Sequence, residues 1–201
     1  RTVLQYWLFY YDNVYRYPFL PPGTIWQSHE GDWEVVNVVL SAAGEPLLVG
    51  LSQHCSGETR SWAATPRRRG HPVVYVALGS HANYFAPGVH QVERGCLPAE
   101  VIAGFQRAGL PLPADVAAAG PAAGPAALGL PETAAVERVG RARPGWIRFP
   151  GVWGELEYWG APPPIGTVPV GSSPVGPAFH AAWRRPLATL ASWRAARPFS
   201  G

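Results

Sequence analysis

The chain has 201 residues, a formal net charge of +3 and few charged side chains, since Asp, Glu, Lys and Arg together make up 14%. This length suits one domain with a substantial core. The 9 Trp, in a chain that is 12% aromatic, exclude a disordered protein because such large rings need burial. The positive charge is too small and too scattered to indicate a nucleic-acid partner. No apolar run approaches the roughly 20 residues of a membrane-spanning helix.

Short strands are the first elements predicted along the chain, because 23 Gly and 23 Pro favour turns over long helices. Residues 3–11 are rich in aromatic and branched side chains, and residues 33–40 are apolar on nearly all of both faces. Residues 47–52 and 72–78 follow as two more apolar segments. We expect the four strands to lie next to one another in an antiparallel β-sandwich, within a single domain over residues 1–201. The predicted fold class is mainly β.

The second half of the chain has a different character. Residues 98–110 have the apolar spacing of a short helix, inside an insertion region over residues 97–145. Residues 111–131 are nearly all Ala, Gly, Pro and Leu, which predicts a long low-complexity loop outside the sandwich. Residues 178–195 predict a helical C-terminal flank that is interrupted at Pro186.

The strongest chemical signal is a His-Glu-Gly-Asp-Trp-Glu segment that begins at His29. Alternate side chains of a strand share a face, so Asp32 and Glu34 point the same way and Trp33 points into the core. A bulge at Gly31 would bring His29 back to the face of Asp32. One imidazole and two carboxylates then form a divalent-metal site, and the hard oxygen ligands favour Mg²⁺, Ca²⁺ or Mn²⁺ over Zn²⁺.

The competing interpretation of this segment is a strand edge with solvated carboxylates. Two carboxylates on one face repel each other unless a cation or an Arg lies between them. Arg60 or Arg148 could supply that charge without any metal.

Two further polar pairs stand at the predicted ends of neighbouring strands, Gln53-His54 and Ser80-His81. A His at a strand end is commonly a structural residue whose ring nitrogens are hydrogen-bonded within the protein. Because imidazole titrates near neutrality, His54 and His81 are also the candidate catalytic acid or base of a pocket shared with the metal site. The sequence contains no serine-protease, Rossmann or P-loop pattern.

Cys55 and Cys96 are the only cysteines. Two isolated cysteines do not form a disulfide framework, so free thiols are the expectation and a bond between them is the alternative. No signal peptide is visible, which slightly favours the cytoplasm, although the chain begins at Arg1 without a Met, so its natural start is not seen. The sequence does not indicate an oligomeric state.

Several ordered motifs resemble the vacuolar-sorting-protein-62-like family of fungi, plants and actinobacteria. The resemblance covers about residues 3–90 and resumes at Trp146–Gly154 and Gly176–Trp183. The matching motifs are Tyr6-Trp-Leu-Phe-Tyr-Tyr11, His29-Glu-Gly-Asp-Trp-Glu34, Ser52-Gln-His54, His71-Pro-Val-Val-Tyr-Val-Ala77 and Gly79-Ser-His-Ala-Asn-Tyr-Phe85.

The segment from His29 to Glu34 is also similar to the metal-binding motif of the necrosis- and ethylene-inducing-peptide-like toxins. These toxins are β-sandwich proteins that bind a divalent cation beside a sphingolipid headgroup site. This resemblance implies that His29, Asp32 and Glu34 are metal ligands. The sequence departs from the toxin motif at Gly31, where the toxins carry a second His, and Asp12 is the only candidate for their upstream carboxylate.

These observations predict a divalent-metal-dependent enzyme, a hydrolase or lyase that acts on a small or phosphate-containing substrate. The alternative is a metal-dependent binding module for a glycan, a polyol or a lipid headgroup, with Trp26 and Trp62 as stacking residues.

Overall fold

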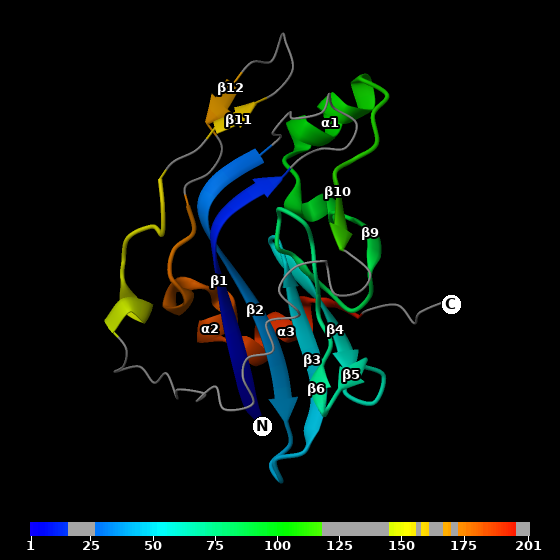
Figure 1. Ribbon diagram of the computed structural model, residues 1–201, viewed down its shortest axis with the longest axis vertical. Helices are drawn as coiled ribbons and strands as arrows, with labels where there is room; N and C mark the ends of the chain where they lie inside the picture. Colours follow the sequence, from blue (N-terminus) through cyan, green and yellow to red (C-terminus); the bar gives the residue numbers. More distant parts are fainter. Residues whose placement is uncertain (16–26, 118–144, 156–157, 161–166, 170–172, 196–201) are drawn as a thin grey trace.

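The computed structural model describes residues 1–15, 27–117, 145–155, 158–160, 167–169 and 173–195. The protein is mainly β, as predicted, and its largest element is a five-stranded sheet in the order β1-β2-β3-β4-β13 (Figure 1). Four of these strands form an antiparallel sheet, and β13 joins β4 in parallel. The strands are β1 (Thr2–Tyr15), β2 (Gln27–Leu40), β3 (Pro46–Gln53), β4 (Ser56–Ser61) and β13 (Arg194–Ala195).

The remaining described strands form pairs. They are β5 (Arg67–Arg68) with β6 (His71–Pro72), β7 (Tyr75–Val76) with β8 (Asn83–Tyr84), β9 (Gly88–Gln91) with β10 (Ala114–Ala117), and β11 (Tyr158–Gly160) with β12 (Thr167–Pro169). The helices are α1 (Ala99–Arg107), α2 (Ala181–Arg184) and α3 (Pro186–Ser192), with 3-10 turns η1 (Arg94–Cys96), η2 (Gly145–Arg148) and η3 (Pro177–Phe179). The single strand predicted over residues 72–78 is wrong, because this segment is divided between β6 and β7, which pair with different partners.

The two faces of the large sheet carry different side chains, as strand alternation requires. One face, which we call the site face, carries the apolar stripe Val36, Val38, Val49 and Leu51, which packs against Phe85. The stripe runs along β2 toward the end where the side chains on this face become polar. The site face therefore buries an apolar core at one end and presents acidic groups at the other.

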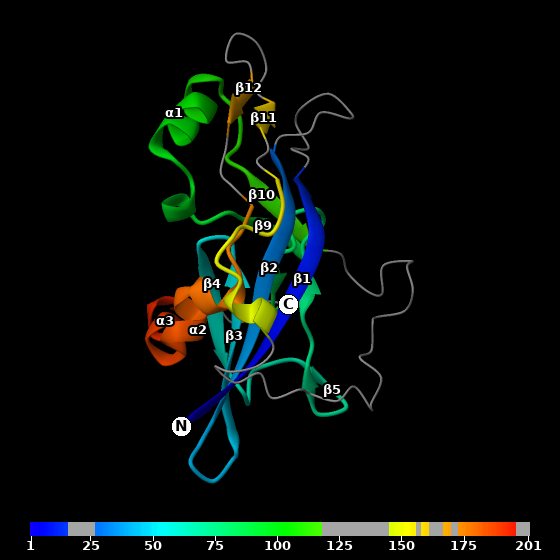
Figure 2. The same ribbon diagram turned by 90° about the vertical axis from the view of Figure 1, so that its left-hand side faces the viewer.

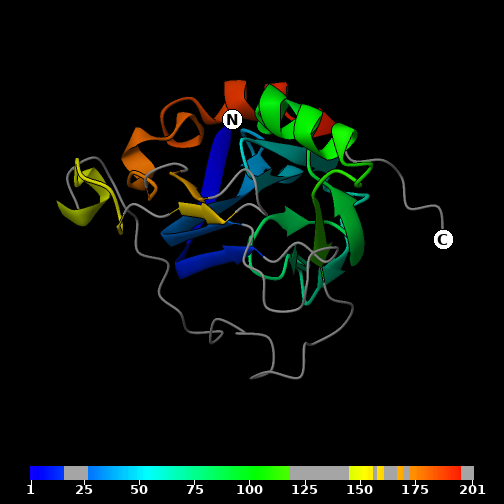
Figure 3. The ribbon, with the colours of Figure 1, turned by 90° about the horizontal axis from the view of Figure 1, so that it is seen from above.

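The opposite face of the sheet is covered by α2 and α3, and Figures 2 and 3 show α1 on the same side. Gly50 and Gly57 permit this close packing, because a Cβ at either position would lie within 2.4 Å of Leu190 or Trp193. The predicted interruption at Pro186 falls where α3 begins, since Pro suits the first turn of a helix. No described helix is long and apolar enough to span a membrane.

The predicted loop over residues 111–131 is wrong at its start, and residues 118–131 lie outside the described residues. Strand β10 pairs with β9 on one side. On the other side it meets the chain after β7, through a bridge between Ala77 and Ala117 and a bond from the Leu78 N–H to the Val116 carbonyl. The insertion region therefore contributes a strand to the structure, and that strand carries Asp115.

The expectation of free thiols is also wrong, because Cys55 and Cys96 form a disulfide. The bond joins the turn between β3 and β4 to η1, across 41 residues of sequence.

The packing of Trp193 on Gly57 generates the first prediction. Gly57→Ala places a methyl group 2.4 Å from the Trp193 ring and 2.6 Å from the Leu51 carbonyl oxygen, so the ring and the backbone of β3 or β4 must shift. We expect a loss of about 1–3 kcal/mol in the free energy of unfolding, measured by urea titration. The control is Gly104→Ala in α1, where the added methyl meets open space and should stabilise by about 0.5–1 kcal/mol. Equal midpoints for the two variants would contradict this account.

Candidate functional site

Asp32 and Glu34 continue the site face of β2 beyond its apolar stripe. Both are nearly buried, with 9% and 4% of their surfaces exposed. Glu34 accepts hydrogen bonds from the Ser52 hydroxyl and, at 3.4 Å, from the Asn83 amide. The Trp33 side chain lies on the opposite face, against Phe9 and other aromatic rings, as alternation along the strand predicts.

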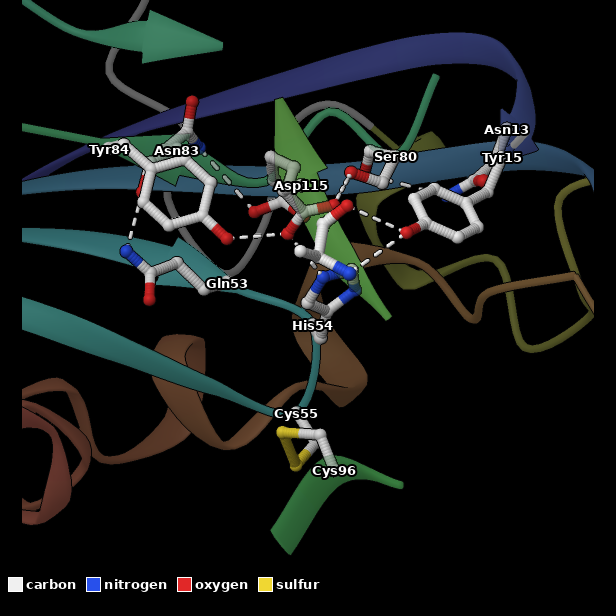
Figure 4. A network of polar contacts seen from close by, with 12 residues as sticks. Asn13, Tyr15, Gln53, His54, Cys55, Ser80, Asn83, Tyr84, Cys96 and Asp115 are labelled. Atoms are coloured by element: carbon white, nitrogen blue, oxygen red, sulfur yellow. Dashed lines mark hydrogen bonds and ion pairs between the residues drawn. A yellow bond between two sulfur atoms is a disulfide. The ribbon is translucent and has the colours of Figure 1, made fainter. Parts of the chain in front are cut away.

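Asp115 is the most enclosed carboxylate of the site, with none of its surface exposed. It accepts hydrogen bonds from three segments: His54 Nε2 at 2.7 Å, the Ser80 hydroxyl at 2.5 Å and the Tyr84 hydroxyl at 2.5 Å (Figure 4). Its strand is fixed in turn by Tyr15, whose hydroxyl donates to the Ala114 carbonyl and accepts from the Ala114 N–H. Asp115 is therefore held by both β1 and the turns around it.

His81 lies against Asp32. Its Nδ1 is 3.1 Å from Asp32 Oδ2, and its ring stacks on Tyr10 with centroids 4.0 Å apart. The turn that carries His81 docks on β1 through Gly79, where a Cβ would lie 2.2 Å from the Val14 carbonyl oxygen. Only glycine permits this approach, and its φ of +83° is also in the left-handed region.

Both candidate imidazoles sit on unusual backbone. His54 and His81 have φ values of 51° and 56°, and only one other described non-glycine residue, Arg69, has a positive φ. His54 occupies the first position of the two-residue turn between Gln53 and Ser56, where hairpins require this conformation. Left-handed backbone at residues other than glycine costs energy and is concentrated at functional sites.

Two asparagine amides connect the acidic groups. Asn13 Nδ2 lies 3.5 Å from both Asp32 Oδ2 and the Ser80 carbonyl oxygen. Asn83 Nδ2 reaches Glu34, and the Asn83 carbonyl accepts a bond from Gln53 at 2.9 Å. The side-chain oxygens of Asn13 and Asn83 are buried and have no hydrogen-bond partner among the described residues. The site therefore contains buried oxygen acceptors that lack a donor.

The imidazoles stand closer to solvent than the carboxylates they contact. The His54 side chain is 26% exposed over a fully buried Asp115, and the His81 side chain is 17% exposed beside Asp32 at 13%. A molecule that approaches from solvent therefore meets the imidazoles before Asp115.

Burial and like charge control the ionisation of the carboxylates. Burial first, and then the charges of Asp32 and Asp115, raise the pKa of Glu34 well above its usual value. Burial also opposes ionisation of Asp115, but the hydrogen bond and charge of His54, with the bonds from Ser80 and Tyr84, hold the pKa of Asp115 below its ordinary 3.8. Burial and the charges of Glu34 and Asp32 raise the pKa of Tyr10 to about 12. Asp115 is thus an anion at neutral pH and Tyr10 is neutral.

Of the three predicted metal ligands, the structure brings Asp32 and Glu34 to one face. Gly31 has a φ of +66°, and His29 Nδ1 lies 2.8 Å from the Gly31 carbonyl oxygen. Asn13, which pairs with His29 across the strands, also contacts Asp32. Within the described ranges, no three His, Cys, Asp or Glu side chains are grouped so that they could hold a metal ion.

The arginines of the competing interpretation lie elsewhere. The Arg60 guanidinium lies 4.5 Å over the Phe85 ring, and Arg148 is exposed in η2. The charges that shift the pKa of Glu34 come from Asp32 and Asp115, and no Arg is among them.

Sequence reasoning missed Asp115, Tyr84 and the two asparagines. Asp115 falls within the low-complexity loop predicted over residues 111–131, although it is the one acidic residue between Leu110 and Pro131. An isolated acid in such a run is the signal that could have marked it. Trp62, predicted to stack on a ligand, packs against the core and is covered by Arg67, and Trp26 lies outside the described residues.

Comparison with known proteins adds no further constraint, because no family model, no curated protein and no solved structure matches the chain.

The buried anion Asp115 generates a prediction about acid stability. Its pKa is lower in the folded protein than in the unfolded chain, so its contribution is complete above the unfolded value and is lost as the pH falls through the folded value. At pH 7, Asp115→Asn should cost about 1.5–3 kcal/mol of unfolding free energy, because charged hydrogen bonds are lost. This cost should shrink below about pH 4, where the wild type loses the same charge.

Urea titrations of both proteins between pH 7 and pH 3 measure this difference, and Asp12→Asn, an exposed carboxylate of β1, is the control. A cost that stays constant over the whole range would show that the charge of Asp115 does not stabilise the fold.

Proposed function

We propose that the protein is a divalent-metal-dependent enzyme, a hydrolase or lyase that acts on a small or phosphate-containing substrate. The observation that carries the proposal is the pair of buried carboxylates, Asp32 and Glu34, on one face, with the partly exposed His81 imidazole at Asp32. A second partly exposed imidazole, His54, contacts Asp115. Two acids at this depth repel each other, and a bound cation would remove that cost. We also propose that the scaffold is an antiparallel β-sandwich with a helical C-terminal flank, and that the chain is a member of the vacuolar-sorting-protein-62-like family.

The donors around this pair fit a hard cation. Asn13 and Asn83 turn their amide nitrogens toward the two carboxylates, at 3.5 Å and 3.4 Å, and their side-chain oxygens are buried without a donor. A rotation of either amide would bring its oxygen to the pair. Carboxylate and amide oxygens are typical ligands of Mg²⁺, Ca²⁺ and Mn²⁺, whereas Zn²⁺ prefers nitrogen and sulfur. His29, the third predicted ligand, contacts the Gly31 carbonyl through Nδ1, and the described residues do not group its ring with the two carboxylates. The proposed cation site therefore rests on Asp32 and Glu34.

The protein groups have separate tasks in this scheme. A bound cation would supply a Lewis acid that polarises an oxygen of the substrate or of water. His81 holds the Asp32 carboxylate through Nδ1 and is itself held by the Tyr10 ring. His54 and His81 are the imidazoles at the solvent side, and an imidazole in this position can serve as a catalytic acid or base.

A second candidate function is a binding module for a glycan or lipid headgroup. It is supported by exposed aromatic rings on the face of β1 and β2 opposite the acidic site: Phe9, Trp146 and Phe149 are 44%, 42% and 48% exposed. The first two pack on Trp33, and Phe149 packs on Trp153. Flat rings of this kind stack on sugars and lie at lipid interfaces. Binding without turnover of any substrate would favour this candidate.

The cation site is tested by calorimetric titration of the wild type with MgCl₂, CaCl₂, MnCl₂ and ZnCl₂. Asp32→Asn should lower the affinity for the preferred ion at least about tenfold, because the amide keeps the shape but removes the charge that a hard cation needs. Glu45→Gln, an exposed carboxylate in the turn after β2, should bind as the wild type does. Far-UV circular dichroism checks that each variant is folded. Absence of binding by the wild type would end the metal proposal.

The enzymatic half is tested by turnover of p-nitrophenyl phosphate, bis-p-nitrophenyl phosphate and p-nitrophenyl acetate. We expect hydrolysis of at least one ester, lost with EDTA and restored by the ion that binds in the titration. Turnover that EDTA leaves unchanged would contradict the metal dependence.

A further inference from the structure

The contact between His54 and Asp115 determines which ring nitrogen carries the proton. Asp115 is a carboxylate that also accepts hydrogen bonds from Ser80 and Tyr84, so it has no proton to donate to the imidazole. The His54 nitrogen at 2.7 Å, Nε2, must therefore be the donor. In the neutral ring, Nδ1 is then the basic nitrogen, and none of the described residues bonds it.

This orientation is enforced from several directions. The two-residue turn holds His54 at a φ of 51°, and the neighbouring Cys55 is bonded to Cys96 (Figure 4). On the other side, Tyr15 fixes the strand of Asp115 through both backbone groups of Ala114. An imidazole held by its turn and by a buried anion, with 26% of its side chain open to solvent, is arranged as a general base is.

We propose that His54 is the general base of the site, acting through Nδ1, and that Asp115 is its positioning residue. This inference deepens the proposed function and rests on it. It selects between the two candidate imidazoles: His81 Nδ1 faces Asp32 and its ring lies flat against Tyr10, so His81 serves the metal-binding carboxylate.

In this role His54 carries one proton from the attacking water to the leaving oxygen. His54 Nδ1 takes a proton from a water molecule as the water oxygen forms its bond to phosphorus or carbon of the ester. The ring becomes an imidazolium, which Asp115 stabilises without accepting its proton. The bond to the leaving oxygen then breaks, and that oxygen takes the proton from Nδ1. The net reaction adds one water across the ester bond and returns His54 to its starting form.

The first test is spectroscopic and needs no substrate. In the wild type with ¹⁵N-labelled histidine, the two ring nitrogens of neutral His54 have distinct shifts for the protonated and the bare atom. We expect one tautomer, with the proton on Nε2. Asp115→Ala should give a mixture of the two tautomers, because the acceptor that selects Nε2–H is gone. If Asp115→Ala does not fold, the wild-type spectrum alone decides, since a proton on Nδ1 or a mixture overturns the inference.

The second test separates binding from proton transfer, with the p-nitrophenyl ester that the wild type turns over fastest. His54→Asn is the informative variant, because Asn tolerates left-handed backbone but cannot accept the proton. It should lower kcat on the order of 100-fold, with KM and ion affinity within a few-fold, and added imidazole should restore part of the rate. Asp115→Asn should lower kcat on the same order and leave KM unchanged. His71→Ala, an exposed imidazole of β6, is the control and should keep the wild-type rate.

The outcomes separate this inference from the proposed function. Wild-type turnover together with full activity of His54→Asn, or with kcat lost only in His81→Asn, overturns the role of His54 and leaves the enzyme proposal standing. An absence of wild-type turnover on all three esters overturns the enzyme proposal and the base role with it, while the tautomer measurement still decides whether Asp115 positions the ring.

Discussion

The structure around the site depends on the burial of Asp115. A carboxylate without exposed surface costs several kcal/mol unless charged hydrogen bonds replace its water. Its donors come from separate parts of the chain: His54 from the turn after β3, Ser80 from the turn after β7, and Tyr84 from β8. The anion is satisfied only when all three segments are in place, so its burial couples the position of each segment to the others.

The same segments carry the strained backbone of the site. His54 and His81 both adopt left-handed φ values that Asn or Gly would adopt with less strain. The cost, about 1–3 kcal/mol for each residue, has to be offset by their contacts with Asp115 and Asp32. Strain that is offset in this way leaves each imidazole one position, which is what proton transfer at a defined atom requires.

The acidic pair and the imidazole at Asp115 belong to one electrostatic unit. The charges of Asp32 and Asp115 both raise the pKa of Glu34, and Asn13 connects Asp32 to the Ser80 carbonyl within one network. A cation at the pair and a proton on His54 would therefore influence each other through the carboxylates between them. The contacts of Asp32, Glu34 and Asp115 thus bring three acids and two histidines together at one end of the sheet.

The sequence by itself determined the features that depend on a short stretch of chain, namely the alternation of side chains along a strand and the position where an apolar strand ends. Alternation along β2 put Asp32 and Glu34 on one face and Trp33 on the other, and the histidines were recognised because each follows an apolar strand. Only the tertiary structure decided that Asp115, 61 residues from His54, is the partner of that ring, that Cys55 bonds Cys96, and that residues 72–78 are divided between two strands. Such pairings depend on which distant segments meet, and no periodicity within a single segment encodes that.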